Sequence, residues 1–152
     1  MAAIGIPEGF EIRSVLPEEA KEASELEKSS LSVPWSTSEL TLFINNPHAI
    51  YLAAFLDGKM AGICGCYAGV GECQITNVAV EEKHRRKNIA LLLIKRLLEE
   101  AKKRNCEKAF LEVAENNLPA IRLYEKLGFR VTGRRKGYYR DSDALLMTLE
   151  EI

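Results

Sequence analysis

The spacing of apolar side chains changes along the chain, and each spacing predicts a type of element. Residues 10–15 alternate apolar and polar side chains, which is typical of a half-buried strand. Pro17 suits a first helical turn, and the helix it opens is expected to run to about Ser29. Ala20, Ala23, Leu26 and Glu27 carry this helix.

A second helix is predicted by the pair Ser36 and Glu39, which have the spacing of a capping box. It should end before residues 45–47, an Asn-Asn-Pro stretch. Trp35, the single tryptophan, precedes this helix. It could be a plug at the edge of the core, or the exposed wall of a binding groove.

Three apolar runs then follow, at residues 50–56, 60–67 and 72–80. Asp57-Gly58 is a strong signal for a hairpin turn, and residues 69–71 turn the chain again, so these runs form an antiparallel meander. Gly62 and Gly65 lie inside the middle strand, where glycine marks a bulge or a close approach of another backbone.

The second half begins with a helix from Ile89, whose apolar residues recur at i, i+3, i+4 and i+7. A strand is expected at residues 108–113. Asn117 suits an N-cap and Gly128 a C-terminal cap, so they bound another helix. Strands at residues 129–132 and 144–149 close the chain.

The predicted order is therefore β-α-α-β-β-β-α-β-α-β-β. It describes an α+β fold with a mixed, mostly antiparallel central sheet, flanking helices and a βαβ crossover at the centre of the sheet. The length of 152 residues fits one domain, residues 1–152.

A basic loop at residues 83–87 separates the third strand of the meander from the helix that begins near Ile89. Lys83, Arg85, Arg86 and Lys87 lie beside the unpaired N–H groups of that helix and the positive end of its dipole. These features together make a site for an anion such as phosphate. A solvated charged loop is the alternative, and this stretch alone does not decide between them.

The composition limits the classes of function that the protein can have. Hydrophobic residues make up 47%, enough for a core, and a net charge of −1 argues against a general nucleic-acid binder. We expect no signal peptide in residues 1–7 and no membrane span, because the longest apolar runs are far too short. The four cysteines form no C-x-x-C pair and only two histidines are present, so we expect no metal site and reduced, cytoplasmic thiols.

Several motifs together resemble the GNAT family of N-acetyltransferases. The segment Arg85-Arg86-Lys87-Asn88-Ile89-Ala90 is similar to the family's Q/R-x-x-G-x-G/A loop, with Asn88 in place of the first glycine. Asparagine is the residue other than glycine that best tolerates the left-handed region. Residues 111–113 and 117–129 are similar to the second half of the family, and residues 33–36, 111–113 and 138–139 make the resemblance nearest to the ribosomal-protein-alanine N-acetyltransferases (RimI-like).

The resemblance implies acetyl-CoA as cosubstrate. Its pyrophosphate would lie on the N–H groups of residues 86–91, and its pantetheine arm would run along the strand ending at Val80, where the family's two central strands separate. The implied cofactor contacts are Val78, Ala79, Val80, Arg85, Arg86, Lys87, Asn88, Ile89, Ala90, Leu91 and Asn117.

The resemblance also implies the reacting groups. Glu112 would be the general base and Tyr124 the general acid toward the CoA sulfur, with a backbone N–H near Val80 stabilising the oxyanion. By spacing alone, Glu112 could be an outward strand residue, Tyr124 a core aromatic and Asn117 only a helix cap. The remaining aromatics of the pattern, Trp35, Tyr138 and Tyr139, would form the walls of a peptide slot. The two tyrosines could instead be ordinary strand-edge residues.

The function that follows is acetylation of a protein N-terminal α-amine, with a ribosomal small-subunit protein (S18-alanine type) as the expected substrate. We expect a cytoplasmic monomer or weak dimer that contacts neither nucleic acid nor membrane. Three alternatives stay open: an acetyltransferase of this family for lysine or a small amine, a CoA-binding module without catalysis, and, least favoured, a nucleic-acid module using the basic loop.

Overall fold

The computed structural model describes residues 8–139 and 141–152, so the start of the chain, where we expect no signal peptide, lies outside the described residues. The strands are β1 Phe10–Ser14, β2 Ala49–Leu56, β3 Lys59–Gly69, β4 Glu72–Val80, β5 Lys108–Ala114, β6 Arg130–Tyr139 and β7 Ser142–Leu149. The α-helices are α1 Ala20–Ser30, α2 Thr37–Ile44, α3 Ile89–Lys103 and α4 Leu118–Lys126. Apart from two short 3-10 turns, Pro17–Glu19 and Glu82–His84, this is the predicted order.

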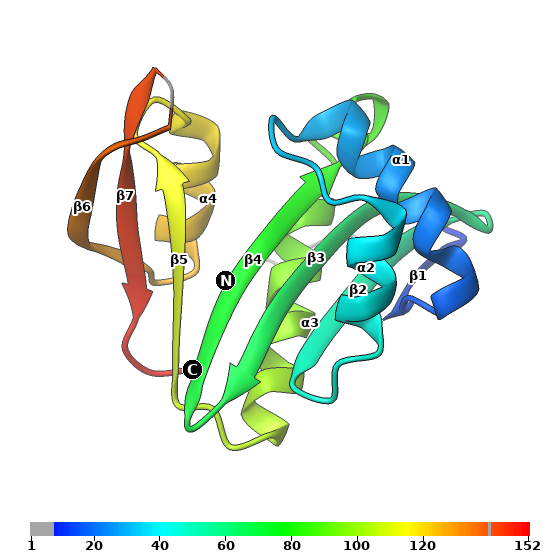
Figure 1. The fold of residues 1–152 in the computed structure, drawn as a ribbon, viewed down its shortest axis with the longest axis horizontal. Coiled ribbons are helices and arrows are strands. Elements are labelled where there is room, and N and C mark those ends of the chain that lie inside the picture. Colours follow the sequence, from blue (N-terminus) through cyan, green and yellow to red (C-terminus); the bar gives the residue numbers. More distant parts are fainter. Residues whose placement is uncertain (1–7, 140) are drawn as a thin grey trace.

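The strands form one sheet in the order β1-β2-β3-β4-β5-β7-β6 (Figure 1). All neighbours are antiparallel except β4 and β5, which α3 joins as a crossover. The parallel pair is short: Glu72, Cys73 and Gln74 pair with Lys108, Ala109 and Phe110. Beyond these residues the two strands diverge, and Figure 1 shows β4 and β5 separating toward their carboxyl ends.

Each face of the sheet has its own layer of helices. The helices α1 and α2 pack Leu26, Leu40 and Phe43 against one face. On the other face α3 buries the apolar side predicted for it, including Leu93 and Leu97, in a layer that also holds Tyr124 of α4. One core therefore lies on each face of the sheet, and the gap between β4 and β5 opens in the sheet that separates the two cores (Figure 1).

The predicted helix ends are confirmed by their hydrogen bonds. Ser36 Oγ accepts from the Glu39 N–H at 3.1 Å, and Glu39 Oε1 accepts from the Ser36 N–H at 3.1 Å. Asn117 Oδ1 accepts from the Ala120 N–H at 3.4 Å, and Gly128 follows α4 with a φ of 99°. These local contacts fix where α2 and α4 begin, and so where their neighbouring loops enter the site.

Gly62 and Gly65 allow the close approaches that the sequence predicts. A Cβ on Gly62 would lie 3.1 Å from Leu93 Cδ1, so glycine lets α3 approach β3. A Cβ on Gly65 would lie 2.6 Å from Asn77 Oδ1 and 2.9 Å from Phe43 Cε1. The register between β3 and β4 also shifts after Gly65, which places a bulge there.

One predicted boundary is wrong. Residues 134–139 were expected to connect two strands, but they extend β6, pairing Arg134 with Leu145 and Tyr139 with Ser142. This stretch is charged and has no apolar alternation because β6 is an edge strand whose residues are mostly exposed. Pairing with β7 gives it a strand conformation that its own side chains do not signal.

Other expectations concern membranes, metals and thiols. Within the described residues, no helix has both the length and the apolarity needed to cross a bilayer, and no cluster of histidine, cysteine and acidic side chains could hold a metal ion. All four cysteines are buried and free.

The turn between β3 and β4 carries local strain. Val70 has a φ of 52° and Gly71 a φ of 78°, as a two-residue type I′ turn requires. Val70 is fully exposed, so no packing compensates a branched side chain in the left-handed region.

Replacing Val70 with asparagine should therefore raise the free energy of unfolding by about 1 kcal/mol, since the left-handed region costs most residues roughly 1–2 kcal/mol. Urea unfolding measures the change. The control Val70→Ala keeps a Cβ but loses the branch, and we expect a smaller gain. A loss of stability in Val70→Asn would contradict a type I′ turn.

Candidate active site

The gap between β4 and β5 exposes the backbone edge of β4. The Glu81 N–H donates to Ala61 O at 2.9 Å, and Ala79 pairs with Ile63, so these residues face β3. Because backbone groups alternate along an antiparallel ladder, those of Val78 and Val80 point the other way, into the gap. Of the three predicted edge residues, these two present backbone groups there, whereas those of Ala79 are directed toward β3.

The end of this edge is already partly bonded. Val80 O accepts from Arg85 Nε at 3.3 Å and from Ser30 Oγ at 3.3 Å. Arg85 therefore links the basic loop to β4, and the N–H of Val80 is left facing the gap.

The basic loop has the backbone of an anion-binding turn. Arg86 has a φ of 68° and Asn88 a φ of 60°, so both lie in the left-handed region. Asn88 thus adopts the conformation that its glycine-like position predicts, and it is the N-cap of α3. The left-handed residues bend the loop over the first turn of α3, where N–H groups lack partners within the helix.

A cleft of about 390 Å³ opens at this turn. It is lined by Val80, His84, Arg85, Arg86, Asn88, Ile89, Ala90, Leu91, Pro119, Arg122, Leu123 and Lys126. Most of the predicted phosphate-binding residues are brought together here. Lys87 is not in the lining; its Nζ lies 3.4 Å from His84 Nδ1. Asn117 caps α4 nearby.

Sequence reasoning missed the α4 side of the cleft. Arg122 and Lys126 line it, and both are exposed cations. Their i, i+4 spacing puts them on one face of α4, which is the signal that could have found them. Together with Arg85 and Arg86 they make the cleft strongly cationic, and helix N-termini add N–H donors, so a ligand carrying several phosphates fits this site.

Glu112 occupies the opposite face of the sheet. Leu111 and Val113 are buried in the α3 and α4 layer, and the alternation of β5 turns Glu112 toward the other side. Its Oε1 lies 3.1 Å from Arg135 Nη2. Its Oε2 is buried and has no hydrogen-bond partner among the described residues. One oxygen of this carboxylate is thus anchored, and the other is free to accept a proton.

Tyr124 lies in the α3 and α4 layer and is 8% exposed. Its ring centroid is 6.0 Å from that of Phe129. Burial raises the pKa of the Tyr124 phenol well above its ordinary value. Like an ordinary phenol, the Tyr124 hydroxyl is protonated at neutral pH and can donate a hydrogen bond. Glu112 and Tyr124 come from opposite faces of the sheet, as a base and an acid acting at two ends of one reacting group would.

The predicted peptide-slot aromatics lie on two different parts of the fold. Trp35 is partly buried and packs edge-on against Phe43, with ring centroids 4.8 Å apart, so it closes the α1 and α2 core as well as bordering its surface. Tyr138 and Tyr139 lie on β6 with centroids 5.0 Å apart. Burial raises the pKa of the Tyr139 phenol, and the nearby Tyr138 and Glu112 raise it further.

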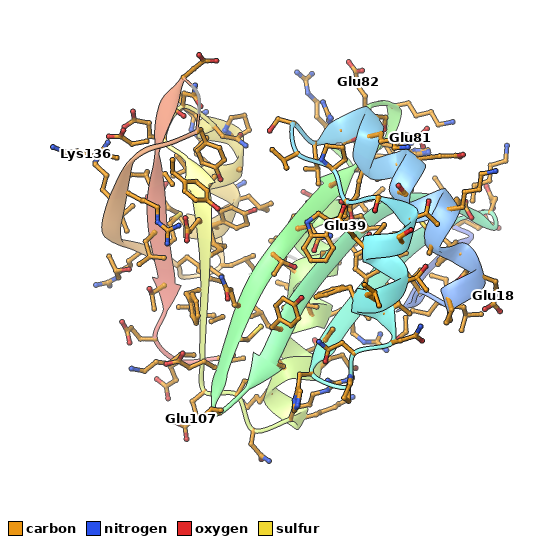
Figure 2. The ribbon with its side chains drawn as sticks, viewed as in Figure 1. Glu18, Glu39, Glu81, Glu82, Glu107 and Lys136 are labelled. Carbon is orange, nitrogen blue, oxygen red and sulfur yellow. The ribbon has the colours of Figure 1, made fainter. Side chains whose placement is uncertain are left out.

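Arg135 was not predicted, although it contacts both Tyr138 and Glu112. Its guanidinium carbon lies 4.7 Å from the centre of the Tyr138 ring, while its Nη2 pairs with Glu112. Figure 2 places Lys136, its neighbour in β6, on one side of the gap and Glu39 and Glu81 on the other. β5 and β7 separate β6 from the gap, so Lys136 belongs to the outer edge of the sheet.

Comparisons with known proteins agree with this geometry. Residues 20–129 match the model of the acetyltransferase (GNAT) family. A Bacillus subtilis (strain 168) protein, provisionally named a [ribosomal protein bS18]-alanine N-acetyltransferase, is 34% identical over 139 residues, covering 90% of this chain and 92% of the relative.

Solved structures give the same result. The ribosomal-protein-S18-alanine N-acetyltransferase from Escherichia coli superposes with a TM-score of 0.86 at 28% identity, over 94% of this chain and 95% of the other. The PaiA N-acetyltransferase from Thermoplasma acidophilum, solved in complex with coenzyme A, has a TM-score of 0.79 at 19% identity, over 93% and 98% of the two chains. The second likeness concerns the fold alone.

Proposed function

The chain belongs to the GNAT family of acetyltransferases, and on that premise we propose that it acetylates the N-terminal α-amino group of a protein, using acetyl-CoA. The observation that carries this proposal is the cationic cleft at the first turn of α3, which fits a cosubstrate with several phosphates, and Glu112 and Tyr124 lie on opposite faces of the same sheet. A ribosomal small-subunit protein of the S18-alanine type is the proposed substrate, because relatives over most of the chain are named for that activity. The proposed location is the cytoplasm.

The cationic cleft fits the cosubstrate that this family uses. Acetyl-CoA, when bound, supplies the acetyl group as a thioester. The first turn of α3 and the side chains of Arg85, Arg86, Arg122 and Lys126 would hold its phosphates. The backbone groups of Val78 would hold the pantetheine arm as if it were an added strand, which leaves the Val80 N–H for the acetyl carbonyl at the end of that arm. The proposed cofactor contacts also include Lys87, Ile89, Ala90, Leu91 and Asn117. Ala79 supports the edge of β4 indirectly, because it pairs with β3.

The protein side chains divide the proton transfers between them. Glu112 would take the proton of the attacking amine through a water molecule, while Arg135 holds Oε1 and keeps the carboxylate oriented. The N–H of Val80 faces the gap and stabilises the oxyanion that develops on the acetyl carbonyl. The Tyr124 phenol would give its proton to the leaving sulfur.

An α-amine suits this base. Its ordinary pKa is about 7.7–8, against about 10.4 for lysine, so a larger fraction is neutral near pH 7 and less driving force is needed. Trp35 before α2 and the pair Tyr138 and Tyr139 on β6 are the proposed walls of a slot for an extended chain end.

The test of this function is a peptide panel assayed by thiol release and mass spectrometry. We expect acetylation of peptides with free N-termini, including the N-terminal sequence of the small-subunit protein S18, and none of the same peptides with blocked N-termini. Acetylation of blocked peptides at lysine would transfer the assignment to the lysine alternative. Binding of CoA without thiol release from any amine would favour the non-catalytic module.

The catalytic assignment predicts that Glu112→Gln and Tyr124→Phe each lower kcat by about a hundredfold, the usual size of a general acid–base contribution. Affinity for CoA should change by less than about twofold, because neither side chain lines the phosphate cleft. Steady-state kinetics and calorimetry with CoA measure these values. Glu115, an acidic residue directly after β5, provides the matched control. Glu115→Gln should behave as wild type. Unchanged turnover in either variant would remove that residue from the mechanism.

The loop geometry predicts that position 88 tunes cofactor affinity. Asn88→Gly keeps the left-handed conformation and removes the side chain beside the phosphates, so CoA should bind a few-fold more tightly. Asn88→Val forces a branched side chain into that conformation at a cost of about 1–2 kcal/mol, so affinity should fall about tenfold. Calorimetric titration with CoA decides. Wild-type affinity in Asn88→Val would show that the turn does not set the binding geometry.

A further inference from the structure

Glu27 is a charged side chain in the interior that the proposed reaction does not use. It lies on α1 and is 0% exposed, and among the residues that the structure describes it is the only charged side chain that is buried. Burying a carboxylate is costly unless donors surround it, and an apolar residue of similar size is often at least as stabilising. Its presence at a core-facing position of an otherwise ordinary amphipathic helix needs a reason beyond packing.

Three donors from three different elements converge on this carboxylate. Oε1 accepts from the backbone N–H of Trp35 at 3.0 Å. Oε2 accepts from Tyr51 Oη at 2.7 Å and from Asn77 Nδ2 at 2.7 Å. Burial and the charge of Glu27 raise the pKa of the Tyr51 phenol, so its hydroxyl stays a donor. The carboxylate is therefore fully bonded and ties the loop before α2 to β2 and β4.

One end of this network is the Trp35 loop. The Trp35 N–H donates to Glu27, and the Trp35 carbonyl accepts from Ser24 Oγ at 2.9 Å. Both backbone groups of this residue are thus held by α1. The ring then packs against Phe43, which leaves the orientation of Trp35 set by α1 and α2 together.

The other end is the bulge of β4. Pairing with β3 moves from Gly65 opposite Asn77 to Cys66 opposite Ile75, which leaves Thr76 unpaired in the ladder. Thr76 Oγ1 donates to Asn77 Oδ1 at 2.6 Å, so the bulge is bonded into the network. It lies just past Gln74, the last residue of β4 that pairs with β5. The network therefore reaches β4 at the point where the gap opens.

We propose that Glu27 is a positioning residue for acetyl transfer: its carboxylate fixes the Trp35 loop relative to the bulged strand β4, and so sets one wall of the acceptor slot. This inference rests on the proposed function, because it takes Trp35 as a wall of that slot. The cofactor cleft lies at α3 and α4, away from the network, and should be little affected.

The test compares three variants of the full chain. Glu27→Leu keeps the helix and approximately the volume but removes the acceptor for Trp35, and the KM for the acceptor peptide should rise about tenfold, as small misplacements do. The KM for acetyl-CoA should change by less than about twofold. Glu27→Gln keeps an oxygen for the Trp35 N–H and should recover most of the loss. Tyr51→Phe removes a different donor from the same carboxylate and is the control, with lower stability but a wild-type acceptor KM.

A second measurement needs no activity. Trp35 is the single tryptophan, so intrinsic fluorescence reports on this loop alone. In Glu27→Leu its emission should shift to the red and acrylamide should quench it more strongly, whereas Tyr51→Phe should leave both unchanged. If Glu27→Leu does not fold, Ser24→Ala removes the second anchor of Trp35 and should give smaller shifts in the same direction.

The outcomes separate the two proposals. Unchanged fluorescence in Glu27→Leu, or in Ser24→Ala where that variant replaces it, would overturn the positioning role, as would equal rises of acceptor KM in Glu27→Leu and Tyr51→Phe. A wild-type enzyme that acetylates no peptide N-terminus would overturn the proposed function, and the fluorescence result would still decide whether Glu27 holds the loop.

Discussion

The site depends on a sheet that is held together at one end and open at the other. The strands β4 and β5 pair through three residues and then separate, which leaves the backbone edge of β4 open near Val78 and Val80. A continuous ladder would satisfy the backbone of β4 with β5 and leave no edge for a ligand. The separation costs hydrogen bonds, and the structure offsets part of that loss within the protein: Arg85 and Ser30 bond the Val80 carbonyl, and the Glu27 network holds the bulge of β4.

The two layers of helices give the opening two different sides. The α3 and α4 layer presents helix N-termini, cations and the buried phenol of Tyr124. The α1 and α2 layer presents the Trp35 loop, and Glu112 points to this same face from β5. A polyanionic cosubstrate and an acceptor amine can therefore approach from opposite faces and meet in the gap. This arrangement separates binding from proton transfer, because the phosphate cleft and the carboxylate share no side chains.

Local signals predicted most of the fold. Ser36 with Glu39 and Asn117 with Gly128 marked helix ends that depend only on residues within one or two turns. Asn88 marked a left-handed turn for the same reason. The β6 extension was missed because residues 134–139 are exposed and charged, and their strand conformation comes from pairing with β7. Arg135 and the pair Arg122 and Lys126 were missed because each meets the site from an element distant in sequence.

The sequence by itself determined the order of elements, their caps, the glycine-dependent close approaches and the family, since these follow from spacing and short-range contacts. Tertiary structure alone decided which groups meet. Glu27 looks in the sequence like one more polar residue of an amphipathic helix, and only the packing of α1 on the sheet makes it the shared acceptor of Trp35, Tyr51 and Asn77. Likewise Glu112 is one more strand residue until the fold brings Arg135 of β6 to its carboxylate. The physical reason is that hydrogen bonding and burial act through space, so a side chain's role depends on partners that its own neighbourhood in the sequence does not contain.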